Sequence, residues 1–190
     1  SLTLGIDYKK ENLNDFNKFF EIKLASVLRD KEENFIPKKT TLNKKSSNFY
    51  GSLSNNFSEF FNLNYKFSVN NNLDSFDYND FGAEFKFNNF NTKVNFVEER
   101  AEMGNTNFLE NSASIQFDEK NYLTFKTRRN RKLNLTEYYD LVYEYQNDCL
   151  VAGIKYKKSY YEDRDLKPSE NLFFTISLIP LTNYEQKIDR

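Results

Sequence analysis

The chain has 190 residues, a formal net charge of −1 at pH 7 and a hydrophobic content of 38%. This nearly balanced charge creates no global field that would favour nucleic acid or an anionic membrane surface as a partner. Because the chain has no histidine and one cysteine, it lacks the side chains for a Cys/His zinc site, a Ser-His-Asp triad or a Cys-His pair.

Aromatic residues are frequent, with 20 Phe and 13 Tyr, although the hydrophobic content is low. This combination favours many half-exposed β-strands over a helical fold, because strands accept aromatic side chains on a pleated surface. No apolar run approaches the roughly 18 residues of a membrane-spanning helix. A strand crosses a bilayer with about 9–11 alternating residues, so crossing by strands remains open.

Alternation of apolar and polar residues begins at the first residues and recurs along the chain. Leu2, Leu4, Ile6 and Tyr8 alternate with polar or small residues, and Leu172, Phe174, Ile176 and Leu178 repeat the pattern near the end. A period of two predicts strands with one apolar and one wet face. The predicted strands cover about residues 2–8, 17–28, 47–54, 61–69, 81–87, 92–98, 113–117, 123–127, 135–146, 150–157 and 171–181.

The connections alternate in length. Short turns are predicted near Asn55, Asn88, Glu119 and Asn147, and longer polar loops at 29–46, 70–80, 101–110 and 161–170. The connection 9–15 is long for the first set, and 129–133 is short for the second. Outer-membrane barrels have short periplasmic turns and longer external loops, whereas Greek-key sandwiches give no reason for this rule. A soluble meander is also compatible with the alternation.

These patterns predict an all-β fold, an antiparallel up-and-down meander of about 11 strands that forms part of a larger transmembrane outer-membrane β-barrel. We expect residues 1–181 to form the barrel portion and 182–190 a polar C-terminal tail. No charged start with an apolar core precedes the first strand, although an outer-membrane protein needs an export signal. We therefore expect a fragment of a longer protein.

The segment 121–181 resembles the C-terminal end of the LptD (OstA) family of LPS-assembly proteins. The matching residues are 128–132 (RRNRK), 135–139 (LTEYY), 143–145 (YEY), 147–149 (NDC) and 163–168 (DRDLKP), followed by the final strand. The resemblance implies a non-enzymatic barrel in the bacterial outer membrane, without cofactor, that inserts lipopolysaccharide into the outer leaflet. It also implies a plug lipoprotein of the LptE type, and periplasmic bridge proteins that contact a missing N-terminal domain.

Four groups of residues are the candidate sites. If 161–170 is external, Cys149 lies at the periplasmic end of a strand, and the resemblance implies a disulfide with a cysteine of the missing domain. The resemblance makes the strand with Leu172, Phe174, Ile176 and Leu178 one lip of a lateral gate. Guanidinium groups suit phosphate binding, so a basic cluster is a candidate for contacts to LPS phosphates. That cluster comprises Arg128, Arg129, Arg131 and Lys132; Asp163, Arg164, Asp165 and Lys167 are expected to form loop ion pairs.

Simpler interpretations stand beside each site. Cys149 can be an inert thiol, the basic cluster a solvated loop, and Glu98, Glu99 and Glu102 a charged strand end instead of a cation site. For the whole chain, the alternatives are another outer-membrane barrel such as a porin, or a soluble β-sandwich binding module. An outer-membrane lipase would normally need a histidine base, which this chain lacks.

Overall fold

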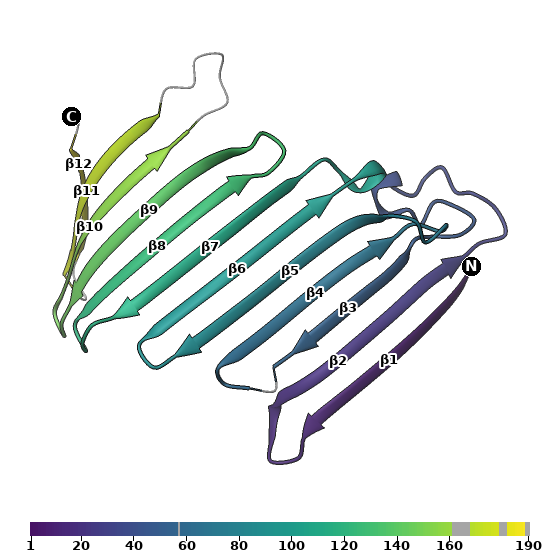
Figure 1. Cartoon of the computed structure of the whole chain (residues 1–190), viewed down its shortest axis with the longest axis horizontal. Helices are drawn as coiled ribbons and strands as arrows, with labels where there is room; N and C mark the ends of the chain where they lie inside the picture. The colour runs from purple at the N-terminus through teal and green to yellow at the C-terminus, as the bar shows by residue number, and fades with distance from the viewer. Residues whose placement is uncertain (57, 161–167, 179–181, 189–190) are drawn as a thin grey trace. The chain divides into compact units, whose positions relative to one another are not determined.

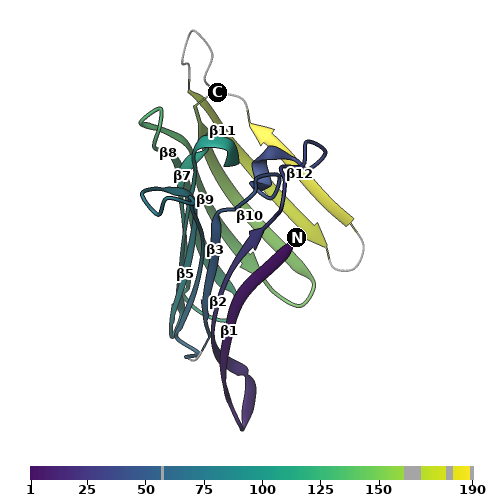
Figure 2. The ribbon, with the colours of Figure 1, turned by 90° about the vertical axis from the view of Figure 1, so that its right-hand side faces the viewer.

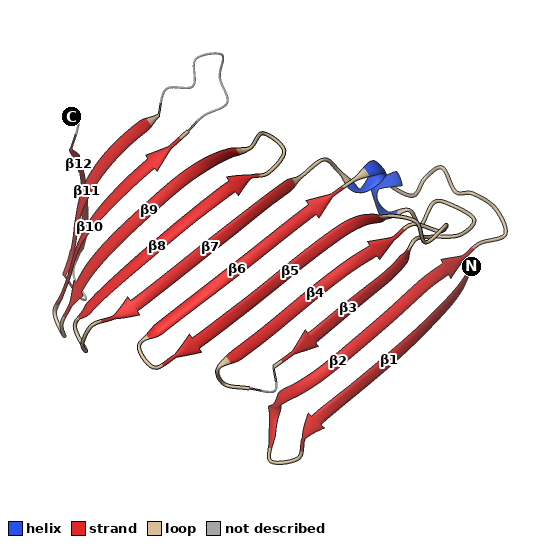
Figure 3. Cartoon of the chain, viewed as in Figure 1, coloured by secondary structure: helices blue, strands red, loops and turns tan. Residues whose placement is uncertain are grey.

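The structure is a computed structural model, and it describes residues 1–56, 58–160, 168–178 and 182–188. These residues form twelve strands and two short 3-10 helices, η1 (Lys38–Thr40) and η2 (Ala101–Met103) (Figure 3). No helix in this described part is long and apolar enough to cross a membrane. The strands are β1 (Leu2–Asn12), β2 (Asp15–Leu28), β3 (Phe49–Asn55), β4 (Phe61–Val69), β5 (Phe76–Phe87), β6 (Phe90–Glu99), β7 (Asn107–Gln116), β8 (Asn121–Asn130), β9 (Leu135–Gln146), β10 (Leu150–Ser159), β11 (Ser169–Leu178) and β12 (Thr182–Ile188).

The strand order in the sheet is the order along the chain, from β1 to β12 (Figure 1). This confirms the predicted all-β, antiparallel up-and-down meander. The order begins at β1 and ends at β12, so the sheet is not closed within the described residues. The chain divides into unit 1, residues 1–85 with 94–108, and unit 2, residues 86–93 with 109–190. Each unit is described by itself below.

The β1–β2 hairpin is longer than its sequence pattern predicts. The ladder continues through Lys9↔Glu21 and Lys10↔Phe20, and a bulge lies between Glu11 and Asn12. The connection predicted at 9–15 is therefore only Leu13 and Asn14. The apolar–polar alternation stops in this part of the strands because its side chains are polar. Backbone pairing continues there, because it does not require an apolar residue at every second position. Only residues 20–25 of β2 pair with β3, so the hairpin tip projects beyond β3 (Figure 2).

The C-terminal end also differs from the expectation. Residues 182–188, expected as part of a polar tail, form β12, which pairs with β11 from Leu178↔Thr182 to Leu172↔Ile188. The strand predicted at 171–181 is present as β11 (Ser169–Leu178), but β12 follows it, so the expectation that it is the last strand was wrong. The sequence pattern concealed β12, because Thr182 and Gln186 occupy positions where an alternating strand would carry apolar residues.

In unit 1, the register places large apolar side chains on one face of a single layer. Ile6 pairs with Leu24, and the same face continues through Phe49 to Val69 and Tyr65 to Phe81. No hydrophobic side chain is buried among the residues that the structure describes. Exposed members of this apolar face include Leu2, Leu4, Ile6, Tyr8, Leu24, Leu28, Phe49, Phe76, Phe81 and Phe85.

Gly51 interrupts this face, and an aromatic ring covers it. A Cβ atom added at Gly51 would lie 2.1 Å from the ring of Phe67, its partner on β4. The Phe67 ring also lies beside Tyr65, with centroids 5.4 Å apart, and beside Phe76, at 6.0 Å. Glycine at this position therefore lets an aromatic side chain lie flat over the strand.

Unit 2 has the same organisation. Tyr143 pairs with Leu123 on one side and Ile154 on the other, and Ile154 pairs with Phe174. The opposite face carries Lys126, Asp140, Lys155 and Lys157. This confirms the expectation that these strands have one apolar and one polar face. Exposed members of the apolar face include Phe125, Tyr139, Leu141, Tyr143, Ile154, Tyr156, Phe174, Ile176 and Leu178.

Candidate functional site

The long loops of unit 1 lie at one end of the strands, which we call the loop edge. The short turns lie at the other end, which we call the turn edge (Figure 1). The loop edge carries residues 29–48, 70–75 and 100–106, and the turn edge carries Leu13 with Asn14 and the connection 56–60. In unit 2, the turns at 117–120 and 147–149 share one edge, opposite the turn 131–134. The unequal loop lengths at the two ends of unit 1 are typical of a barrel whose two ends face different compartments. In unit 2 the described turns are short at both ends.

The loop 29–48 is fixed by a buried polar network that we call the loop anchor, formed by Thr41, Asn48, Tyr50, Ser68 and Asp77. The Asn48 side-chain amide donates to Ser68 Oγ at 3.0 Å and to Asp77 Oδ2 at 2.8 Å. The Asn48 backbone N–H donates to Thr41 Oγ1 at 3.1 Å, and this hydroxyl also bonds the Tyr50 hydroxyl. Asn48 and Ser68 are almost completely buried. Buried polar groups need such partners, so the network specifies one loop conformation.

Two ion pairs tie the same loop to the last residue of β6 and to η2. Lys39 Nζ lies 3.0 Å from Glu99 Oε1, and Lys44 Nζ lies 3.0 Å from Glu102 Oε2. Glu98 accepts from Arg100 at 2.9 Å and from the Asn107 amide at 2.8 Å. These carboxylates are satisfied by protein cations and amides. No cluster of three or more His, Cys, Asp or Glu residues that could hold a metal is present in the described part of the chain.

The structure divides the predicted basic cluster into two parts. Arg128 belongs to β8 and forms ion pairs with Glu110, at 3.3 Å, and with Glu137, at 2.8 Å. Arg129 Nη2 donates to Asn134 Oδ1, and Arg129, Arg131, Asn134 and Leu109 line a hollow of about 360 Å³. Lys132 lies exposed in the turn after β8. Arg129 and Arg131 are therefore the members that share an open hollow, whereas Arg128 is neutralised by carboxylates.

Cys149 is an exposed free thiol in the turn between β9 and β10. Its backbone N–H donates to Asn147 Oδ1 at 3.0 Å, and the Leu150 N–H donates to the same oxygen at 2.8 Å. The side chain of Asn147 therefore holds the turn, and the thiol is accessible to a partner. The predicted disulfide stays a prediction.

The remaining predicted groups have different outcomes. Leu172, Phe174, Ile176 and Leu178 lie on one face of β11, but β11 has β10 on one side and β12 on the other. It is therefore not a terminal strand. Asp163, Arg164, Asp165 and Lys167 lie outside the described residues, so their expected ion pairs stay a prediction.

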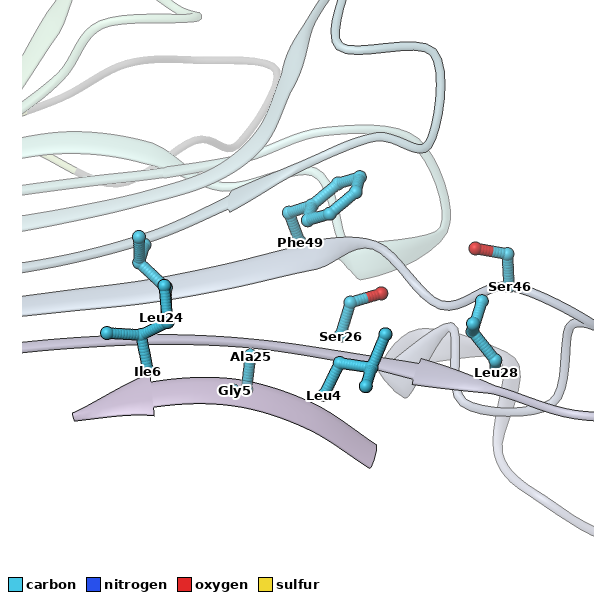
Figure 4. Close-up of a pocket in the computed structure, with 9 residues that line it drawn as sticks. All are labelled: Leu4, Gly5, Ile6, Leu24, Ala25, Ser26, Leu28, Ser46 and Phe49. Atoms are coloured by element: carbon cyan, nitrogen blue, oxygen red, sulfur yellow. The ribbon is translucent and has the colours of Figure 1, made fainter. Parts of the chain in front are cut away.

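An apolar hollow of about 450 Å³ lies on the apolar face of unit 1 near the loop edge (Figure 4). Leu4, Ile6, Leu24, Leu28 and Phe49 form its walls, and Ser26 leaves space between them. The Ser26 hydroxyl donates to the backbone oxygen of Ser47 at 3.3 Å. Ser46, at the end of the long loop, also lines this hollow.

Sequence reasoning missed the loop anchor. The available signal was the run Ser46-Ser47-Asn48 immediately before β3, since small polar residues often bond nearby backbone. Its partners Ser68 and Asp77 are distant in sequence and could not be assigned without the register.

A scan against protein-family models found no match to this chain, and a search of curated proteins found none either.

Proposed function

We propose that this chain is part of an LptD-like β-barrel of the outer membrane that takes part in inserting lipopolysaccharide into the outer leaflet. The observation that carries the membrane part of this proposal is the apolar face of each unit. Every unit is a single layer whose large apolar side chains are exposed. Contact with water over such an area is unfavourable, and lipid acyl chains would cover it.

The other face supports the same assignment. Charged residues there form ion pairs along the strands, such as Lys23 with Glu21 at 2.9 Å and Lys155 with Asp140 at 3.9 Å. A water-filled or protein-filled lumen accepts such groups, whereas lipid does not. In this proposal the loop edge faces outside, and the turn with Cys149 faces the periplasm.

The lipopolysaccharide part of the proposal rests on the family resemblance of 121–181. Arg129 and Arg131 are the candidate contacts for LPS phosphates, because they line an open hollow beside the turn 131–134 of unit 2. Since β12 follows β11, the C-terminal lip of a lateral gate would be β12. The plug lipoprotein and the periplasmic bridge proteins remain proposed partners.

Site-specific photo-crosslinking in Gram-negative cells tests this proposal. A photoreactive amino acid at position 131, in the turn between β8 and β9, should crosslink to lipopolysaccharide. The same group at position 120, in the turn between β7 and β8, is the control and should give no such product. Equal crosslinking at both positions, or none at position 131 in a protein that reaches the membrane, would contradict the proposal.

A porin-like barrel is the second candidate, and the loop anchor favours it. Loops fixed on the polar face narrow a channel, and here Asn48 ties the loop 29–48 to Ser68, whose register partners Tyr50 and Tyr78 lie on that face. Conductance in planar bilayers distinguishes the two functions. Steady ion conductance by the full-length protein, without lipopolysaccharide crosslinks, would favour the porin.

A further inference from the structure

The register of unit 1 aligns five polar residues in one row across five strands. Asp7 pairs with Lys23, Lys23 with Ser52, Ser52 with Lys66, and Lys66 with Asp80. The row thus has a serine at its centre, one lysine on each side of the serine, and one carboxylate at each end. The row does not form a sequence motif, because its members are spread from residue 7 to residue 80.

A hollow of about 380 Å³ opens at the centre of this row. Its polar lining comprises Lys23, Ser52 and Lys66, together with Tyr50 and Tyr78 from the neighbouring row. The remaining lining is apolar and comprises Leu24, Ala25, Gly51, Phe67 and Met103. Adjacent strands are about 4.8 Å apart, so the Cα atoms of the two lysines are separated by about 10 Å. Flexible four-carbon stems can bring both ammonium groups over the small Ser52 side chain.

The charges around the hollow leave one cation available. Within the part of the chain that the structure describes, the Lys66 ammonium has no hydrogen-bond or ion-pair partner. Asp80, its neighbour in the row, accepts instead from the Tyr78 hydroxyl at 3.1 Å. Lys23 is shared with Glu21 at 2.9 Å and Asp7 at 3.8 Å. The Ser52 hydroxyl also lacks a partner among the described residues.

We propose that Lys66, Ser52 and Lys23 form a subsite that binds a phosphoryl group on the polar face of unit 1. Each ammonium carries three donors, and lysine binds phosphate as a point charge. The Ser52 hydroxyl supplies a neutral donor between them. Asp7 and Glu21 compete for Lys23, so binding is weak and reversible. The subsite requires only that solvent reaches the polar face, and it does not depend on the proposed transport of lipopolysaccharide.

Titration with inorganic pyrophosphate tests the subsite. In the full chain, solubilised in detergent and carrying ¹³C-labelled lysine, the Cε resonances of Lys66 and Lys23 should shift and saturate together. Lys66→Met should weaken binding about tenfold, because a hydrogen bond to a charged group is lost. Lys126→Met is the matched control. Lys126 is an exposed lysine on the polar face of unit 2, also without a hydrogen-bond or ion-pair partner among the described residues, and its loss should leave the affinity unchanged.

Two lipids identify the source of the phosphoryl group. Short-chain phosphatidic acid should shift the same resonances, and the matching diacylglycerol should not. Tighter binding of the phospholipid than of pyrophosphate assigns the subsite to lipid headgroups, and the reverse order assigns it to free anions. Equal shifts of all lysines, unchanged binding by the Lys66→Met protein, or equal effects of the two lipids would overturn the proposal. Membrane insertion is measured separately, so failure here leaves the proposed function intact.

Discussion

At the scale of single residues, the face of the sheet on which a side chain lies determines its surroundings more than its residue type does. Phe174 and Thr175 are neighbours on β11, yet their register partners Ile154 and Gly153 lie on opposite faces. Phe174 is 42% exposed although it is one of the larger apolar residues. In a self-contained soluble fold, such a residue would be covered by a second layer.

Phe174→Arg tests the lipid-facing assignment. If this position lies near the bilayer midplane, the substitution should destabilise the membrane-inserted protein by about 2–4 kcal/mol, because a charge on the lipid face is costly. Thr175→Arg is the matched control and should have a smaller effect, since it points to the polar face. Urea titration in lipid bilayers measures both, and similar losses for the two variants would refute the face assignment.

Asp118 gives a dependence on pH at the turn between β7 and β8. Its carboxylate accepts from the Lys120 backbone N–H at 2.8 Å and from the Asn121 amide, also at 2.8 Å. These hydrogen bonds, led by that of Lys120, lower the pKa of Asp118 below its ordinary value of 3.8. A lowered pKa in the folded state means that the stabilisation is complete above pH 3.8 and is lost as pH falls through the folded pKa.

The Asp118→Asn variant isolates this contribution. At pH 7 it should exchange the turn amides faster than the wild type, because the neutral amide is a weaker acceptor for the Lys120 N–H. Below the folded pKa the two proteins should behave alike. Hydrogen exchange of residues 117–121 across this pH range provides the measurement, and a difference that persists in acid would show that the charge is not responsible.

At the scale of elements, alternation in the sequence identified eleven of the twelve strands and located their ends poorly. Eleven predicted strands correspond to β1–β11, but β1 continues to Asn12 and β5 begins at Phe76. Backbone hydrogen bonds extend a ladder through polar residues when a neighbouring strand is present. Side-chain patterning reports burial on a face, and it is silent on this backbone pairing.

The loop anchor is the element most open to a direct test. Asn48→Ala removes the donors to Ser68 and Asp77 and leaves a carboxylate poorly satisfied, which should cost about 1–3 kcal/mol. The segment 38–48 should then become mobile, and trypsin should cut it faster after Lys38, Lys39, Lys44 and Lys45. Limited proteolysis followed by mass spectrometry measures the cleavage.

Asn64→Ala is the control for the loop anchor. Asn64 lies on the polar face of β4 and is exposed, with no hydrogen bond of its side chain in the described chain. Its replacement should leave cleavage at the four lysines at the wild-type rate. If both variants are cut equally, the protection comes from the strands as a whole and the loop anchor contributes nothing specific.

At the scale of the whole molecule, each unit leaves one apolar face uncovered within the described residues. A single antiparallel layer needs a partner on that face, and lipid, a second sheet or another protein could supply it. The polar face with its ion pairs and, in unit 1, the unequal loop lengths at the two ends of the strands favour lipid. If lipid covers this face, the full-length protein should float with outer-membrane vesicles in a density gradient.

Cys149 connects this chain to the rest of the protein in our proposal. In the full-length protein, Cys149→Ser should abolish the mobility shift between reducing and non-reducing gels, because the exposed thiol is the only one in this chain. Asp148→Ser, in the same turn, should preserve the shift. A shift that survives the loss of Cys149 would exclude the predicted bridge.

The sequence by itself determined the fold class, the apolar and polar face of most strands, and the alternation of short turns and long loops. These properties follow from local periodicity, which each strand carries independently of its partners. Only the tertiary structure decided where the strands end, that β12 exists, which arginine is neutralised by Glu110 and Glu137, and that Lys23, Ser52 and Lys66 share a row. Those properties depend on the register between strands. Register is a relation between distant segments, and it cannot be predicted from either segment alone.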